Sequence, residues 1–135
     1  MKRVNSLPQG EKMNIKSKII VLSILILAFT ASAFAQETVS PEAAAKFIGQ
    51  QKTVCGNVAS AHYATRSKGQ PTFLNLNKPY PHPIFTVLIW GSDRSKFEKP
   101  PEALSGKEIC VQGVIQSYKG GPEIIVKDPS QIKVK

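Results

Sequence analysis

The stretch GQPTFLNLNKPYPHPIFTVLIWGSDRSKF, residues 69–97, holds two apolar runs that are separated by a proline-rich loop. The first run, Pro71 to Leu76, carries Thr, Phe and Leu, and the second, Ile84 to Trp90, is β-branched and aromatic. Both compositions are typical of β-strands, and the alternating prolines at 79, 81 and 83 make the connection stiff and extended. The stretch therefore predicts two neighbouring strands, and its flanks decide which sheet they join.

Further strand patterns lie on both sides of these two. Lys52 to Tyr63 is rich in Val and Ala, Lys107 to Tyr118 alternates apolar and polar residues, and Pro122 to Asp128 carries Ile, Ile and Val in succession. Gly120-Gly121 predicts a tight turn between the last two. The sequence thus predicts five short strands.

Two segments read as helical. Ser40-Pro41-Glu42 supplies a capping oxygen, a proline where no N–H is needed and an acid in the first turn, so a helix is expected from there to Ile48, ended by Gly49. A short helical segment is expected over Ser92 to Phe97, before Pro100-Pro101.

Five strands with a helical segment between the third and the fourth match the order of an OB-fold, a five-stranded Greek-key barrel. Closure into a barrel removes the strand edges that a small sheet would otherwise expose. The predicted fold is therefore mainly β, a five-stranded OB-fold barrel with an N-terminal helix. The alternative is an open antiparallel sheet packed on that helix.

The succession VCGNVASAHY, GQPTFLNLNKPYP, FTVLIWGSDRSKF, GKEICVQGVIQSYKGGPEIIV and DPSQI resembles small exported bacterial OB-fold domains of the nucleic-acid-binding type, which are also found attached to secreted nuclease-type proteins. The likeness extends from Ser40 to about Ile132. It implies binding without catalysis. Because the OB-fold hosts many ligands, the resemblance is more specific for fold than for function.

Residues 1–35 are predicted to be a removed secretory signal peptide. Lys12, Lys16 and Lys18 precede an apolar run from Ile19 to Phe29, and an A-x-A site ends at Ala35, so cleavage is expected before Gln36. The alternative is an uncleaved membrane anchor. Met13 competes with Met1 as the start of translation.

Residues 36–135 then form a single OB-fold domain with 13 basic and 8 acidic residues, a net charge of +5. A mildly basic surface assists binding to an anionic polymer, and it also serves solubility. Export places the domain in the periplasm or outside the cell, and no stable membrane span is expected after cleavage.

Cys55 and Cys110 are predicted to form a disulfide bond. Each lies on the face of its strand opposite the apolar residues, and in an OB barrel the first and fourth strands are antiparallel neighbours. Export provides an oxidising compartment. The alternative is two unlinked thiols. A redox function is disfavoured, because no C-x-x-C motif is present.

The chain lacks the patterns of known catalytic and cofactor sites. His62 and His82 have no metal-ligand spacing, the acids are scattered, and no phosphate loop or nucleophile elbow is present. No enzymatic activity, metal or cofactor is therefore expected.

OB-folds bind single strands on their second and third strands and on the loops after the first and fourth, where basic and aromatic residues hold phosphates and bases. This chain places suitable residues there. The candidate nucleic-acid-binding residues are Arg66, Lys68, Phe73, Asn75, Tyr80, Trp90, Tyr118 and Lys119. Asn77 shares the strand face of Phe73 and Asn75, and Tyr63 flanks the region.

Most of these residues have a second interpretation. Phe73 fits the barrel core as well as a stacking platform, and Trp90 could stack on a base or lie under the N-terminal helix. Arg66 and Lys68 fit a solvated loop. The sequence accordingly favours an exported protein that binds single-stranded DNA or RNA without catalysis. The alternative is a periplasmic stress, small-ligand or protein-protein binding module, with an envelope protein as a possible partner.

Overall fold

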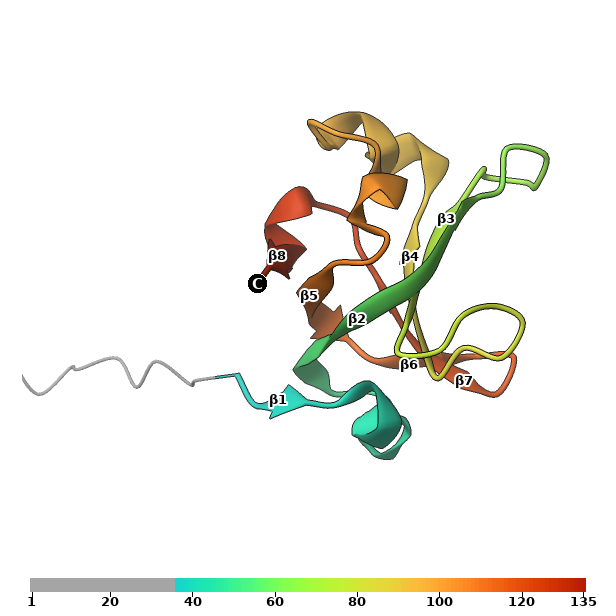
Figure 1. Ribbon diagram of the computed structural model, residues 1–135. Coiled ribbons are helices and arrows are strands. Elements are labelled where there is room, and N and C mark those ends of the chain that lie inside the picture. The colour runs from blue at the N-terminus through green and yellow to red at the C-terminus, as the bar shows by residue number, and fades with distance from the viewer. Residues whose placement is uncertain (1–35) are drawn as a thin grey trace, which may run out of the picture. The chain divides into compact units, whose positions relative to one another are not determined.

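The computed structural model describes residues 36–135. The predicted signal peptide and its alternative, a membrane anchor, lie outside the described residues. None of the helices within 36–135 is long and apolar enough to cross a membrane. Figure 1 shows the arrangement of the strands and short helices.

The strands lie where the sequence predicted them, with three short additions. The five expected strands are β2 (Gln51–Tyr63), β3 (Thr72–Leu76), β4 (Phe85–Ile89), β5 (Glu108–Val114) and β7 (Gly121–Ile125). The additions are β1 (Thr38–Val39), β6 (Gln116–Tyr118) and β8 (Ile132–Val134). β6 belongs to the predicted fourth strand, which divides at Ile115. The backbone of Ile115 bonds instead to Gly49 and Gln50, so the chain leaves the β2 ladder there.

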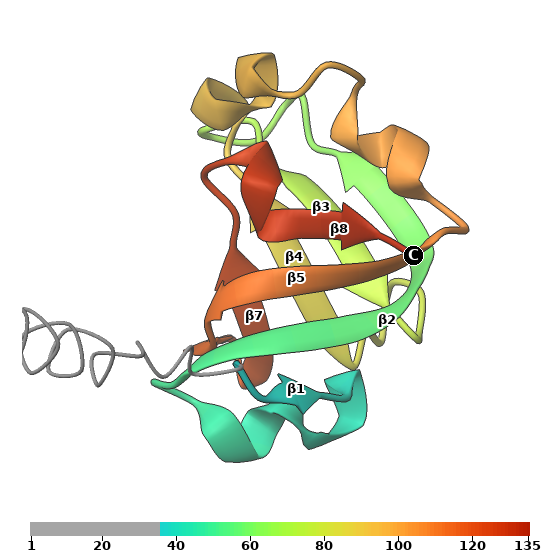
Figure 2. The same cartoon turned by 90° about the vertical axis from the view of Figure 1, so that its left-hand side faces the viewer.

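The strands form one sheet in the order β6-β7-β4-β3-β2-β5-β8, with β1 parallel to β2. β2 is central, because its first half pairs with β5 and its second half with β3. Figure 2 shows β2 running beside β5 and then curving round. The sequential order β2, β3, β4, with β7 beyond β4 and β5 on the other side of β2, fits an OB-fold.

The pairing of β2 with β3 shifts between Val58 and Ser60, which leaves Ala59 unpaired. Such a bulge bends a strand and reverses which face later residues occupy. Val54 and Val58 lie inward before the shift, whereas Ala61 lies inward after it and Ser60 is left facing outward. The bulge therefore lets one long strand serve both halves of the sheet.

Closure of a five-stranded barrel is not confirmed, because no ladder joins β5 to β7 within the described residues. The two strands approach by packing instead. A Cβ added to Gly113 would lie 2.7 Å from Cγ2 of Ile124, so only glycine permits this contact. The sheet is thus open in its hydrogen bonding while the core between its halves is filled.

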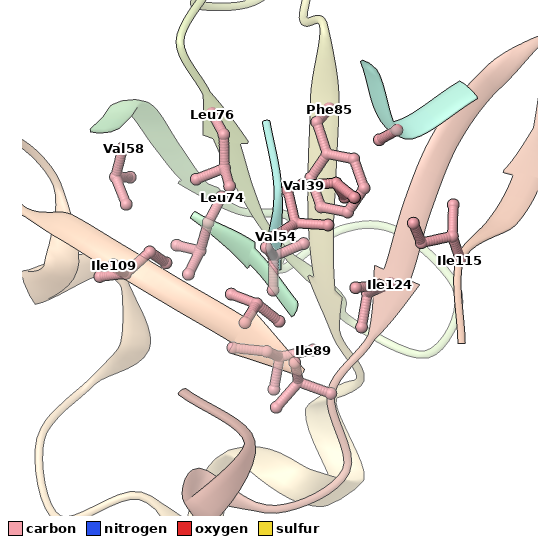
Figure 3. Close-up of a cluster of buried hydrophobic side chains, with 14 residues drawn as sticks. Val39, Val54, Val58, Leu74, Leu76, Phe85, Ile89, Ile109, Ile115 and Ile124 are labelled. Atoms are coloured by element: carbon pink, nitrogen blue, oxygen red, sulfur yellow. The ribbon is translucent and has the colours of Figure 1, made fainter. Parts of the chain in front are cut away.

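The core is made by alternate residues of the strands, as the sequence parity predicted. Phe85, Val87 and Ile89 on β4 are buried, as are Ile109 and Val111 on β5. Figure 3 shows these side chains meeting those of β2, β3 and β7.

The predicted helices are 3₁₀ helices. The N-terminal one, η1 (Pro41–Phe47), starts at Ser40, whose Oγ accepts a hydrogen bond from the Ala43 N–H, and it buries Ala44 in the core. Between β4 and β5 lie η2 (Gly91–Lys96) and η3 (Pro101–Leu104), and η4 (Pro129–Gln131) precedes β8. Pro100-Pro101 was expected to end helical structure, but Pro101 is the first residue of η3. A proline is tolerated there because the N–H of a first helical residue has no partner within the helix.

The predicted disulfide is present. Cys55 and Cys110 are directly paired residues of β2 and β5, and a bond joins their sulfur atoms. The sulfur atoms link the two strands from the face opposite the core.

Candidate functional site

An open groove of about 1000 Å³ lies on the outward face of β2, β3 and β4. Its floor is made by the strands, and its walls by the loop between β3 and β4 and by the β6–β7 hairpin. The described residues that line it are Ser60, Ala61, His62, Ala64, Ser67, Phe73, Asn75, Tyr80, Pro81, His82, Pro83, Ile84, Phe85, Thr86, Tyr118, Lys119, Gly120, Gly121, Pro122 and Glu123. In Figure 1 the β2–β3 loop and the β3–β4 loop lie at opposite ends of β3 and β4.

A row of polar side chains crosses the floor. The strand register places Ser60, Asn75, Thr86, Glu123 and Gln116 opposite one another on successive strands. Cross-strand neighbours of this kind lie close enough for their side chains to interact. Ser60, Asn75, Thr86 and Glu123 of this row line the groove, and Gln116 continues the row beyond the lining residues.

Hydrogen bonds fix the orientation of these side chains. Asn75 Nδ2 donates to Ser60 Oγ at 2.9 Å, Thr86 Oγ1 donates to Asn75 Oδ1 at 3.0 Å, and Gln116 Nε2 donates to Glu123 Oε1 at 2.8 Å. Asn75 is only 4% exposed and Glu123 only 5%. Side chains that are both buried and bonded are held in place before a ligand arrives.

Aromatic side chains lie around this polar row. Phe73 is half-buried on the floor, and Tyr80 and Tyr118 are 79% and 55% exposed on the walls. An exposed tyrosine offers a flat apolar face at little conformational cost, so it suits contact with a planar ligand.

The two walls are rigid for different reasons. The β3–β4 loop contains the three alternating prolines, which restrict its backbone, and the Tyr80 N–H donates to Ser60 Oγ at 3.1 Å. In the hairpin, Lys119 and Gly120 have φ of 49° and 79°, the left-handed values that a tight two-residue turn requires. Gly120-Gly121 was predicted to form this turn, which in fact uses Lys119 and Gly120.

Five of the eight predicted binding residues line the groove: Phe73, Asn75, Tyr80, Tyr118 and Lys119. Phe73 is absent from the core cluster, so its core interpretation is wrong. Lys119 Nζ lies 5.4 Å from the centroid of the Tyr118 ring. Tyr80, Tyr118 and Lys119 thus lie on the walls and Phe73 and Asn75 on the floor, and their binding of nucleic acid stays a prediction.

Arg66, Lys68 and Trp90 do not line the groove. Arg66 and Lys68 are exposed in the β2–β3 loop, whose Ala64 and Ser67 reach the groove, and neither forms an ion pair with another described residue. Trp90 packs on the same loop, since a Cβ on Gly69 would lie 2.9 Å from its ring. The ring therefore lies on this loop and not under the N-terminal helix, because η1 packs near the Phe85 end of β4.

Asn77 and Tyr63 also differ from expectation. Asn77 has a φ of 64° and turns away from Phe73 and Asn75, and its side chain bonds to Glu42 and to the N–H of Asn57. The hydrogen bond from Asn77 to the Glu42 carboxylate lowers the pKa of Glu42. Tyr63 lies under the guanidinium of Arg94, so both residues serve the structure and not the groove.

The sequence missed Ser60, His62, Thr86 and Glu123, which line the groove, and Gln116, which bonds to Glu123. Thr86 lies in the β-branched run predicted as a strand, but nothing in the sequence marked it as a site residue. Ser60 and His62 face the groove only because of the bulge at Ala59. Only Glu123 carried a signal in the sequence. It is an acid directly before the apolar residues Ile124 to Val126, where a carboxylate is unusual.

Within residues 36–135 no three His, Cys, Asp or Glu side chains gather as a metal site would require.

No protein-family model matches the chain, and no curated protein matches it significantly. Among solved structures, it is similar to a putative aspartyl-tRNA synthetase from Leishmania major Friedlin, with 8% identity, a TM-score of 0.47 and coverage of 88% of this chain and 26% of that one. It is also similar to the aspartyl tRNA synthetase from Entamoeba histolytica, with 18% identity, a TM-score of 0.47 and coverage of 76% and 22%. The OBody AM1L10, bound to hen egg-white lysozyme in its structure, shows 18% identity, a TM-score of 0.47 and coverage of 77% and 98%. The chain spans well under two thirds of either synthetase, and its fold assignment rests on the strand order described above.

Proposed function

We propose that this protein is an exported OB-fold module that binds single-stranded nucleic acid without catalysis. The observation that carries the proposal is the groove on β2, β3 and β4, in which Phe73, Tyr80 and Tyr118 surround a fixed polar row. OB-folds bind oligonucleotides on this face and between these loops.

The distribution of charge sets the orientation of a bound strand. The described residues that line the groove include one lysine, Lys119, and one acid, Glu123, and they include no arginine or aspartate. Phosphates would gain little from such a floor. Arg66 and Lys68, by contrast, are exposed beside the groove. The bases therefore lie inward against the aromatic rings and amides, and the phosphates lie outward near the basic loop and Lys119.

Export is part of the same proposal. The disulfide between Cys55 and Cys110 is compatible with an oxidising compartment, and the signal-like segment before Gln36 supplies the route. Purification of the protein after export from a bacterial host, followed by mass determination, tests the processing. A chain that starts at Gln36 supports export, and a retained leader contradicts the predicted cleavage.

The binding test is a titration of a fluorescently labelled single-stranded oligonucleotide with the processed protein, followed by anisotropy at several salt concentrations. If three or four basic residues contact phosphates, log K falls against log salt with a slope of about −2 to −3. K119A is expected to weaken binding, whereas K99A, which removes an equal charge from an exposed site outside the groove, is the matched control.

A second candidate is a small uncharged ligand. The near-neutral lining and the aromatic walls favour it, because such grooves hold planar or cyclic molecules by stacking and a few polar contacts. The same titration distinguishes the two. Absence of oligonucleotide binding at low salt would reject the nucleic-acid proposal in favour of a ligand whose affinity does not depend on salt.

A further inference from the structure

The buried carboxylate of Glu123 stands out among the residues that line the groove. Glu123 is 5% exposed, so nearly all of it is enclosed by β4, β6 and β7. A charged group is rarely buried in this way without partners. The side chain therefore needs an explanation beyond solubility.

One of its oxygens is already satisfied. Gln116 Nε2 donates to Oε1 at 2.8 Å, whereas the second oxygen, Oε2, has no hydrogen-bond partner among residues 36–135. No fully buried side-chain nitrogen or oxygen in this part of the chain lacks a partner. Because Oε2 has no partner there, it is not fully buried, and Glu123 is among the residues that line the groove.

The neighbours of Glu123 hold it in this orientation. Thr86 is its partner on β4 and donates its hydroxyl hydrogen to Asn75 Oδ1 at 3.0 Å, so that hydrogen is not available to the carboxylate. Gln116 fixes the other side. The result is a preoriented acceptor whose Oε2 receives no hydrogen bond from another side chain within residues 36–135.

We infer that Glu123 makes the groove selective for bases that carry an amino group, namely cytosine, adenine and guanine, over thymine and uracil; this inference rests on the proposed binding of single strands. A carboxylate accepts hydrogen bonds and donates none. An exocyclic amino group supplies the matching donor, as when a carboxylate accepts from cytosine N4. Thymine and uracil have the carbonyl oxygen O4 where cytosine has its amino group, and their ring donor N3–H lies between two carbonyl oxygens that repel a carboxylate.

The test compares oligo(dC) with oligo(dT) of equal length, because the two bases have the same ring size and the same backbone. Anisotropy titrations of the processed protein at one fixed low salt concentration give the ratio of dissociation constants. We expect oligo(dC) to bind about tenfold more tightly than oligo(dT). An oligonucleotide of N4,N4-dimethylcytosine, which lacks the amino hydrogens, is expected to bind no better than oligo(dT).

E123Q tests the residue itself. The amide oxygen of the variant can keep the bond from Gln116, so its NH₂ group faces the groove as a donor. The dC to dT preference is then expected to fall to about one or to reverse. E98Q is the matched control, since it removes an equal charge from an exposed residue outside the groove and is expected to keep the preference.

The outcomes separate the two proposals. Equal binding of oligo(dC) and oligo(dT), or a preference that survives in E123Q, overturns this inference and leaves single-strand binding intact. Absence of binding to every oligonucleotide overturns the proposed function and the inference together. If circular dichroism shows that E123Q does not fold, the dimethylcytosine oligonucleotide still tests the dependence on amino hydrogens with the unaltered protein, and binding as tight as that of oligo(dC) overturns the inference.

Discussion

The guanidinium carbon of Arg94 lies 3.5 Å from the centroid of the Tyr63 ring, which places a cation of η2 over the aromatic face of the last residue of β2. The same guanidinium donates to both carboxylate oxygens of Glu102, at 2.8 and 2.9 Å, and to Thr72 Oγ1. One side chain thus ties η2 and η3 to the ends of β2 and β3. These contacts hold the β4–β5 connection onto the sheet.

Replacement of Arg94 is expected to destabilise the protein. R94A leaves Glu102 without its partner and Tyr63 without its cover, so the free energy of unfolding should fall by about 1–3 kcal/mol. R94K should lose much of the same energy, because a lysine cannot make the two parallel bonds or stack. Urea denaturation measures both. K99A, at an exposed residue, is expected to change stability by less than about 0.5 kcal/mol; a similar loss there would contradict the role of Arg94.

The ion pair also makes stability depend on pH. The bonds from Arg94 lower the pKa of Glu102 below its ordinary 4.5 in the folded protein. A carboxyl group with a lowered folded pKa contributes stability above its unfolded pKa, and that contribution is lost as the pH falls through the folded value. E102Q is therefore expected to be less stable than the unaltered protein at neutral pH. The difference in free energy of unfolding between the two proteins should shrink below pH 4.5. Urea midpoints of both proteins across this range measure the difference, and a constant deficit would contradict the linkage.

Removal of the disulfide is expected to lower stability substantially. The bond closes a separation of 55 residues. On the chain-entropy model, this constraint on the unfolded chain is worth about 4 kcal/mol. The double variant C55A/C110A should therefore unfold at a much lower urea concentration. Addition of a reductant to the variant is the control, since it should have no further effect.

Gly113 is expected to tolerate no larger side chain. A Cβ there would lie 2.7 Å from Cγ2 of Ile124, at the point where β5 and β7 pack without a ladder. G113A should destabilise the protein by about 1–3 kcal/mol through overpacking. Thermal unfolding measures the loss. V114A, at the adjacent residue with 51% exposure, is the control and should change little.

Substitutions of the two wall tyrosines and of Trp90 should differ in their effect on single-strand binding. Y80A and Y118A each remove an exposed ring from the groove, so each is expected to weaken single-strand binding by about 1–3 kcal/mol. W90F is expected to leave the affinity nearly unchanged, because Trp90 packs on Gly69 and does not line the groove. A large effect of W90F with none from the tyrosines would place the binding surface elsewhere.

The strands and the disulfide could be predicted from the sequence because their signals are local or depend on parity alone. β-Branched and aromatic composition marked β4, and alternation of apolar and polar residues marked β5. The positions of Cys55 and Cys110 on the outward faces followed from the two-residue period of a strand. Tyr118 and Lys119 could be identified because a tight turn leaves an aromatic and a cation no core to occupy. These inferences need no knowledge of which strands are in contact, beyond the pairing of the first and fourth.

Other features depend on register, which only the tertiary structure decides. The row from Ser60 to Glu123 exists because Ala59 bulges and because β4 pairs with β7, two facts that no local pattern in the chain encodes. Asn75 and Asn77 have the same parity, but a positive φ at Asn77 separates them. The sequence by itself determined which residues face inward on a regular strand such as β5, whereas the bulge in β2 and the pairing across strands determined which outward residues meet. The physical reason is that burial acts on each residue separately, while a site requires residues from distant segments to be aligned.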